Sequence, residues 1–212
     1  MSLGIDLGTT GVKATVLDAA RRVAGTAAVE HGAAVECNIA GAAEQDPAAL
    51  LRALRECLAA LPGDALGAVT AVGVTGQMHG VVLWVAPGGP APRTSRLVTW
   101  EDARAGGAFL DALNAAHSSP RVAPGYGASS LAWLAAFEPR ALEGYDCAGT
   151  IGDLVVAVLC GLDAPVMDPT NAAAFGLYDA AAARWDRDAA RCVHGARTDI
   201  RECIFVFCIT RA

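Results

Sequence analysis

The feature that most constrains the fold is a glycine-flanked turn, Gly8–Gly11, between two β-prone segments close to the start of the sequence. In Leu3–Leu7 apolar residues alternate with glycine and aspartate, and Val12–Leu17 is again β-prone. The pattern predicts a strand, a tight turn and a second strand. Two interpretations of the turn are open. G-T-T-G is acceptable chemistry for an ordinary hairpin, but glycines at both ends also leave backbone amides uncovered, which suits a bound phosphate.

The residues around the turn carry the phosphate interpretation. The threonine hydroxyls of Thr9 and Thr10 add donors, and Asp6 is placed to hold a hydrated divalent cation. Lys13 is the only lysine among 16 basic residues, and it lies beside the turn, where it either faces a phosphate or is an exposed strand lysine. No Walker pattern, G-x-x-x-x-G-K-[ST], occurs in the sequence.

Composition limits the classes of partner. The chain has 212 residues, enough for one large domain with a sizeable core. A net charge of −6 and a pI near 5.1 argue against nucleic acid or an anionic membrane surface as a partner. Seven cysteines without metal-ligand spacing, and the lack of a signal sequence, predict reduced thiols in a cytoplasmic protein.

The order of the predicted elements indicates the fold class. Strands are expected at 3–7, 12–18 and 23–31, followed by a helix over about 47–61 with Asp46 as its N-cap and Pro47 at its first position. The uncharged run 65–92 is too interrupted by glycine and proline to span a membrane, and is interpreted as a buried sheet with strands at 69–75 and 81–86. The remaining expected elements are a strand at 96–100 and helices at about 104–115, 129–137 and 151–160. Three successive strands and then α-β units predict an α/β domain of the ribonuclease-H-like type found in actin and Hsp70 ATPases, rather than a Rossmann unit.

Several motifs in sequence order resemble one particular family. The segments D-L-G-T-T-G-V-K, V-G-V-T-G-Q-M-H-G and T-W-E-D-A-R are similar to the amino-terminal half of the FGGY carbohydrate kinases. Members of this family are two-domain enzymes of the actin and Hsp70 superfamily that phosphorylate sugars and polyols with MgATP. The resemblance extends from Leu3 to about Asp188.

The resemblance implies roles for residues in the first two motifs. Asp6 would hold Mg²⁺ through water, and the residues facing the transferred phosphate would be Gly8, Thr9, Thr10 and Lys13. The first sugar-contacting turn would comprise Gln77, Met78 and His79. Amide and imidazole groups offer the directed hydrogen bonds that a polyhydroxy substrate needs. Without the family resemblance, His79, a lone histidine between glycine-rich strands, would be interpreted as a structural residue.

The third motif supplies more of the implied sugar pocket. Trp100, Asp102 and Arg104 match the family's W-x-D-x-R segment, in which a tryptophan lies under the sugar and a carboxylate accepts from its hydroxyls. The alternative is a core tryptophan with a solvated ion pair. Tyr126, within a G-Y-G segment, is a further candidate for substrate binding.

Two further polar residues, Asp153 and Asn171, lie outside these motifs. Asp153 lies where a helix is expected to begin, and is interpreted as a cap. Asn171 is interpreted as pocket lining.

The family's remaining catalytic parts are not found in the sequence. The general base, an aspartate early in the second domain, and the second ATP-binding domain have no counterpart here, so we expect residues 1–188 to be the amino-terminal kinase domain and 189–212 a divergent tail. The family is one of ATP-dependent enzymes, but this chain alone is expected to be inactive, with the carboxy-terminal domain as its natural packing partner. A non-catalytic protein is the alternative. An actin-like ATPase without sugar specificity is disfavoured by the Gln77–His79 and Trp100–Arg104 segments.

Overall fold

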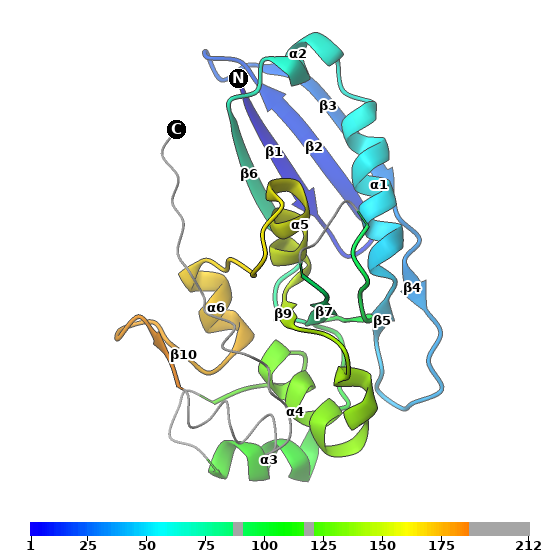
Figure 1. Cartoon of the computed structure of the whole chain (residues 1–212), viewed down its shortest axis with the longest axis vertical. Coiled ribbons are helices and arrows are strands. Elements are labelled where there is room, and N and C mark those ends of the chain that lie inside the picture. The colour runs from blue at the N-terminus through cyan, green and yellow to red at the C-terminus, as the bar shows by residue number, and fades with distance from the viewer. Residues whose placement is uncertain (87–90, 117–120, 187–212) are drawn as a thin grey trace.

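A four-stranded sheet forms the upper half of the molecule (Figure 1). The computed structural model describes residues 1–86, 91–116 and 121–186. The strand order is β3-β2-β1-β6, built from β1 (Ser2–Leu7), β2 (Gly11–Leu17), β3 (Val23–Glu30) and β6 (Ala71–Gly76). The first three strands are antiparallel neighbours and β6 runs parallel to β1. The predicted three successive strands, the helix after them and the following strand are confirmed, and the structure adds that this last strand is parallel to β1.

One face of this sheet is covered by helices. The apolar side chains of β1 and β2 that point to this face form a core with those of α1 (Pro47–Ala59) and α5 (Ile151–Cys160). The α1 helix begins where the sequence predicts: the side chain of Asp46 accepts a hydrogen bond from the Ala48 N–H at 3.1 Å, and Pro47 occupies the first turn. Its leucines lie on the side that faces β2 and β3, which explains why the helix crosses back over these two strands.

The lower half carries the remaining, shorter elements (Figure 1). Two small sheets have the orders β4-β5-β8 and β7-β9, from β4 (Ala34–Val35), β5 (Glu44–Gln45), β8 (Leu97–Val98), β7 (Val82–Trp84) and β9 (Cys147–Gly149). The helices there are α3 (Gly107–Ala115), α4 (Gly127–Phe137), α6 (Pro169–Phe175) and a 3-10 turn, Pro139–Leu142. The short helix α2 (Gly63–Gly67) lies instead at the top of Figure 1, at the end of the main sheet. A short ribbon pairs β10 (Tyr178–Asp179) with β11 (Arg184–Trp185).

The interpretation of residues 65–92 as a buried sheet is correct for β7 and wrong for β6. All three residues of β7 are buried, whereas Val72 in β6 is 53% exposed. The reason is position: among the described residues β6 is an edge strand of the main sheet, and an uncharged sequence does not reveal which strand lies at an edge. None of the described helices is long and apolar enough to cross a membrane.

Candidate active site at the ends of the first and fourth strands

Hydrogen bonds from protein donors to the carbonyls of the turn between β1 and β2 hold this turn in place. Gly8 N–H donates to the Gly11 carbonyl at 2.9 Å, and Gly11 itself leaves no room for a side chain because an added Cβ would lie 2.9 Å from the Val29 carbonyl oxygen. Two carbonyls of the turn accept hydrogen bonds from His31. The Gly8 carbonyl accepts from the His31 ring at 3.2 Å, and the Thr10 carbonyl accepts from the His31 N–H at 3.2 Å. With the carbonyls occupied, the N–H groups of the turn are the ones available to an anion.

Thr9 and Thr10 provide those N–H groups. Within the described part of the chain, neither backbone amide donates to a protein acceptor. Thr10 is exposed and Thr9 is half-buried. Two adjacent amides of the turn are therefore left for an acceptor from outside the described residues, which is what the phosphate prediction requires.

Asp6 and Lys13 lie next to this turn on the sheet face that the helices leave uncovered. They are directly opposite each other in the β1–β2 register, and Thr75 of β6 lies opposite Asp6 on its other side. All three are exposed and line a shallow depression on the sheet together with the small residues Gly4 and Gly73. The structure therefore brings an anionic and a cationic side chain together beside the Gly8–Gly11 turn, and their roles toward a cation and a phosphate stay predictions.

The second turn, Gln77–Gly80, connects β6 to β7 and lies beside the first. Gln77 N–H donates to the Leu7 carbonyl at 2.8 Å, which fixes the two turns at neighbouring strand ends. His79 adopts a left-handed backbone conformation with φ of 58°, uncommon for a residue with a side chain. Its Nδ1 donates to the Ala174 carbonyl at 2.6 Å, and its ring stacks on Tyr126 with 4.3 Å between centroids. Nδ1 is therefore engaged with a carbonyl, and Nε2 is the ring nitrogen that this contact does not use.

The other sugar candidates on this side are Met78 and Tyr126. Met78 is 61% exposed, so its thioether chain is available as an adaptable apolar wall. Tyr126 immediately precedes α4 and reaches the site through its stack on His79.

Trp100 joins the sugar side to the phosphate turn. Its side chain is 44% exposed, and its indole N–H donates to the Thr9 hydroxyl at 3.3 Å. The structure thus places a partly exposed tryptophan directly beside the Gly8–Gly11 turn.

Asp102 and Arg104 are not brought to the surface of the site. Asp102 is 2% exposed, and its carboxylate accepts from the Ala43 N–H at 2.9 Å and from the Arg104 Nε at 2.9 Å. The Arg104 side chain is 3% exposed, pairs with Glu44 at 2.7 Å and lies over the Trp133 ring. These contacts anchor the segment that carries Trp100, and the structure shows no free face of either residue toward a sugar.

Gln45 is a buried polar residue that the sequence analysis did not identify. Its side chain contacts the Thr9 carbonyl at 2.8 Å and the Gln77 amide at 2.9 Å, so it touches both turns. The sequence offers little signal for it, because Gln45 lies one residue before the helix cap Asp46 and pairs with segments remote in the chain.

Asp153 and Asn171 belong to one hydrogen-bonded cluster with Thr150 at the start of α5. Thr150 and Asp153 make a capping box at the start of α5, as the cap interpretation predicts. Asn171 donates to the Thr150 hydroxyl at 3.0 Å. Asp153 is 4% exposed, and burial raises its pKa to about 7 despite the opposing hydrogen bonds from Thr150.

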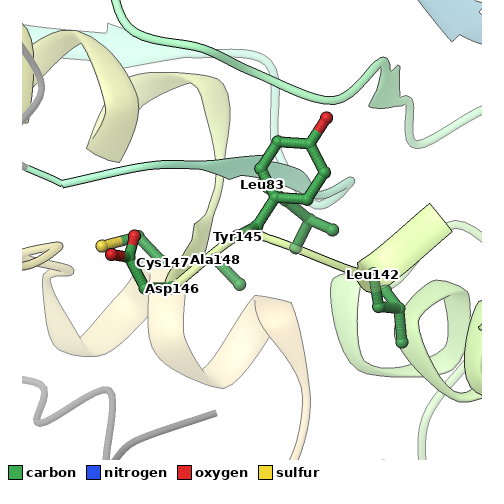
Figure 2. Close-up of a pocket in the computed structure, with 6 residues that line it drawn as sticks. All are labelled: Leu83, Leu142, Tyr145, Asp146, Cys147 and Ala148. Carbon is green, nitrogen blue, oxygen red and sulfur yellow. The ribbon is translucent and has the colours of Figure 1, made fainter. Parts of the chain in front are cut away.

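A small cavity elsewhere in the lower half is unrelated to this site. It lies between β7, the 3-10 turn and β9, lined by Leu83, Leu142, Tyr145, Asp146, Cys147 and Ala148 (Figure 2). Its volume of about 10 Å³ is at the lower limit for one water molecule, which excludes a sugar.

A metal site made by protein alone is not found among the described residues, where no three His, Cys, Asp or Glu side chains gather. Mg²⁺ bound through one or two carboxylates together with substrate phosphates needs no such cluster. The single carboxylate of Asp6 beside the phosphate turn fits that mode.

The fold and the paired turns define a domain of the sugar-kinase type, and comparison with known proteins identifies the family. Residues 1–200 match the amino-terminal domain of the FGGY family of carbohydrate kinases, and the chain belongs to that family. It is 43% identical to the sedoheptulokinases of Homo sapiens and Mus musculus over 90% and 89% of its length. It spans only 45% and 44% of those relatives.

A solved structure shares the architecture. The xyloylose kinase from Brucella ovis superposes with a TM-score of 0.74 at 30% identity, covering 88% of this chain and 39% of that protein. The ribonuclease-H-like fold of actin-type ATPases, expected from the order of strands, is thereby confirmed.

Proposed function

We propose that this chain forms the sugar-binding and phosphate-binding half of a kinase that transfers the γ-phosphate of ATP to sedoheptulose, giving sedoheptulose 7-phosphate. The substrate is suggested by the 43% identity to two sedoheptulokinases. The observation that carries the proposal is the hydrogen bond from the Trp100 indole to the Thr9 hydroxyl, because it joins a sugar platform to a phosphate turn. We propose residues 1–188 as the kinase domain, while the match to the family's amino-terminal domain extends to residue 200. The 189–212 segment lies outside the described residues.

In this mechanism the chain's residues bind and orient the reactants. The bound MgATP supplies the phosphoryl group and the cation that neutralises its charge. The Thr9 and Thr10 amides and the Lys13 ammonium hold the transferred phosphate, and Asp6 holds the cation through water. Gln77, Met78, His79, Trp100 and Tyr126 surround the sugar, while Asp102 and Arg104 hold the Trp100 segment in place.

The experiment is an assay of sedoheptulose-dependent ADP release from MgATP. It compares the 212-residue chain with the same chain joined to the carboxy-terminal half of human sedoheptulokinase. We expect turnover from the joined protein, at ordinary kinase rates of about 1 to 100 s⁻¹, and none from the chain alone, since the family's general base lies in the other half. A joined protein that is folded, binds ATP and ignores sedoheptulose would contradict the proposed substrate.

Xylulose is the second candidate substrate, favoured by the 30% identity to the xyloylose kinase from Brucella ovis. The same assay with xylulose separates the two through the ratio of kcat/KM values. A folded protein that binds sugar but transfers no phosphate in either form would support the non-catalytic alternative.

A further inference from the structure

One buried amide side chain contacts both turns of the proposed site. Gln45 is 5% exposed and is the second residue of β5, held by pairing with Ala34 on one side and Leu97 on the other. Its Nε2 donates to the Thr9 carbonyl at 2.8 Å, and its Oε1 accepts from the Gln77 Nε2 at 2.9 Å. We call this chain of hydrogen bonds the Thr9–Gln45–Gln77 relay.

The direction of the relay is set at the phosphate turn. A backbone carbonyl only accepts, so Gln45 must present its NH₂ group to Thr9 and its oxygen to Gln77. Gln77 must then present its own NH₂ group to Gln45, which turns its Oε1 away. That oxygen is buried, and among the described residues it has no hydrogen-bond partner. The orientation of a candidate sugar-binding amide is therefore dictated by a bond to the phosphate turn.

A second side chain contacts the first turn without reaching the second. His31 also holds the turn from behind, through the Gly8 carbonyl at 3.2 Å, but its other ring nitrogen accepts from the Ala33 N–H at 3.0 Å. The His31 contacts end in the local backbone. The Gln45 contacts continue to the second turn.

We propose that Gln45 is a positioning residue for phosphoryl transfer, which keeps the phosphate turn and the sugar turn in register through the relay. This rests on the proposed function, since the two turns bind phosphate and sugar only if the chain is part of a sugar kinase. Gln45 itself touches neither substrate. Its effect is on the distance and angle between a bound phosphate and a bound sugar, to which transfer rates are sensitive.

The test uses the ¹⁵N-labelled 212-residue chain and inorganic phosphate as the probe, with sodium chloride at matched ionic strength as the blank. In the unmodified chain, phosphate is expected to shift the Thr9 and Thr10 amide signals and, with the same midpoint, the Gln77 side-chain NH₂ signals. In Gln45→Met, which keeps the side-chain length but removes donor and acceptor, the turn amides should still respond and the Gln77 response should be lost.

The control is Asp46→Ala, which removes the cap of α1 at the neighbouring position and leaves the relay intact. It is expected to lower stability and to keep both responses, so a loss of response through general destabilisation is detected. A Gln77 response that persists in Gln45→Met overturns the relay. The relay is also overturned if the Gln77 response is lost in Asp46→Ala as well as in Gln45→Met.

A failure of the proposed function gives a different result. If phosphate shifts no turn amide in the unmodified chain, the phosphate site is wrong, and the relay is judged from the spectra without ligand. Gln45→Met must then move the signals of the Thr9 amide and of the Trp100 indole, which donates to Thr9. Unmoved signals overturn the relay. In the joined kinase, the same variant is expected to lower kcat about 10- to 100-fold with each KM changed less than about threefold, and a loss confined to KM contradicts positioning.

Discussion

Replacing the buried carboxylate of Asp153 with an amide should change how the stability of the domain depends on pH. Asp153 is 4% exposed, and burial raises its pKa from the ordinary 3.8 to about 7. An acid with a raised pKa binds more protons in the folded state than in the unfolded state. The folded state is therefore favoured by protonation, and stability falls as pH rises between about 4 and 7.

The structure sets the size of the effect. The difference between 3.8 and about 7 corresponds to at most about 4 kcal/mol of unfolding free energy lost across that window. Asp153→Asn abolishes this loss. The Asp153 Oδ2 accepts from both the N–H and the hydroxyl of Thr150, at 2.7 and 2.8 Å. An asparagine that keeps its oxygen on these two donors places its NH₂ group at the Oδ1 position. There it meets the NH₂ group of Asn171, which donates to Asp153 Oδ1 at 3.5 Å, and loses a bond worth about 1 kcal/mol.

The two stability curves should therefore cross. At pH 4 the Asp153→Asn variant is expected to be less stable than the unmodified chain by about 1 kcal/mol, and at pH 8 more stable by about 1 to 3 kcal/mol. Urea unfolding followed by circular dichroism at several pH values measures both curves. The pKa values of Asp18 and Asp168 are lowered by their hydrogen bonds, so these groups act in the opposite direction, losing stability as pH falls. They are present in both proteins and largely cancel in the difference. Parallel curves from pH 4 to 8 would refute the reasoning.

Three further predictions concern the turns and the carboxy-terminal segment. His79→Ala in the joined kinase should reduce kcat/KM for the sugar by about 1 to 3 kcal/mol through lost hydrogen bonding while leaving the KM for ATP nearly unchanged; an equal effect on both substrates would indicate a structural histidine. Gly11→Ala should lower the free energy of unfolding by about 1 to 3 kcal/mol, because the new Cβ would lie 2.9 Å from the Val29 carbonyl oxygen, whereas Gly73→Ala has no neighbour within 4 Å and should change it little in the same urea titration. Deleting residues 189–212, whose uncharged Ile204–Ile209 run favours self-association, should raise soluble yield and lower light scattering under reducing conditions; a lower yield or melting temperature would show that the segment packs on the fold.

The sequence was sufficient for elements whose signal is local. The alternation in Leu3–Leu7 and the Asp46–Pro47 start of α1 predicted elements that the structure confirms, because strand periodicity and helix caps depend on neighbouring residues. The exposure of Val72 could not be predicted in this way. Apolar character marks a strand, but the edge position of β6 is set by the pairing of the whole sheet.

The site shows the same limit for buried polar contacts. The turn residues Thr9 and His79 stood out through their glycine neighbours, whereas the role of Gln45 depends on a contact with Gln77, 32 residues away in the chain. Asp102 likewise accepts from the Ala43 N–H across 59 residues. Partners this remote are created only when the chain folds, so the motif marks the region of the site without showing which side chains face the substrate.

The measurement that tests the central claim most directly is a sedoheptulose titration of the 212-residue chain, followed through the indole N–H signal of Trp100. The signal is assigned by its disappearance in Trp100→Phe, with glucose as the control sugar. We predict a saturable shift with sedoheptulose that Gln77→Met and His79→Ala weaken. The reason is that the exposed indole of Trp100 contacts Thr9, which the relay links to Gln77 in the second turn. A folded chain whose Trp100 signal does not move with sedoheptulose, or moves equally with glucose, would contradict the assignment of this site to a sedoheptulose kinase.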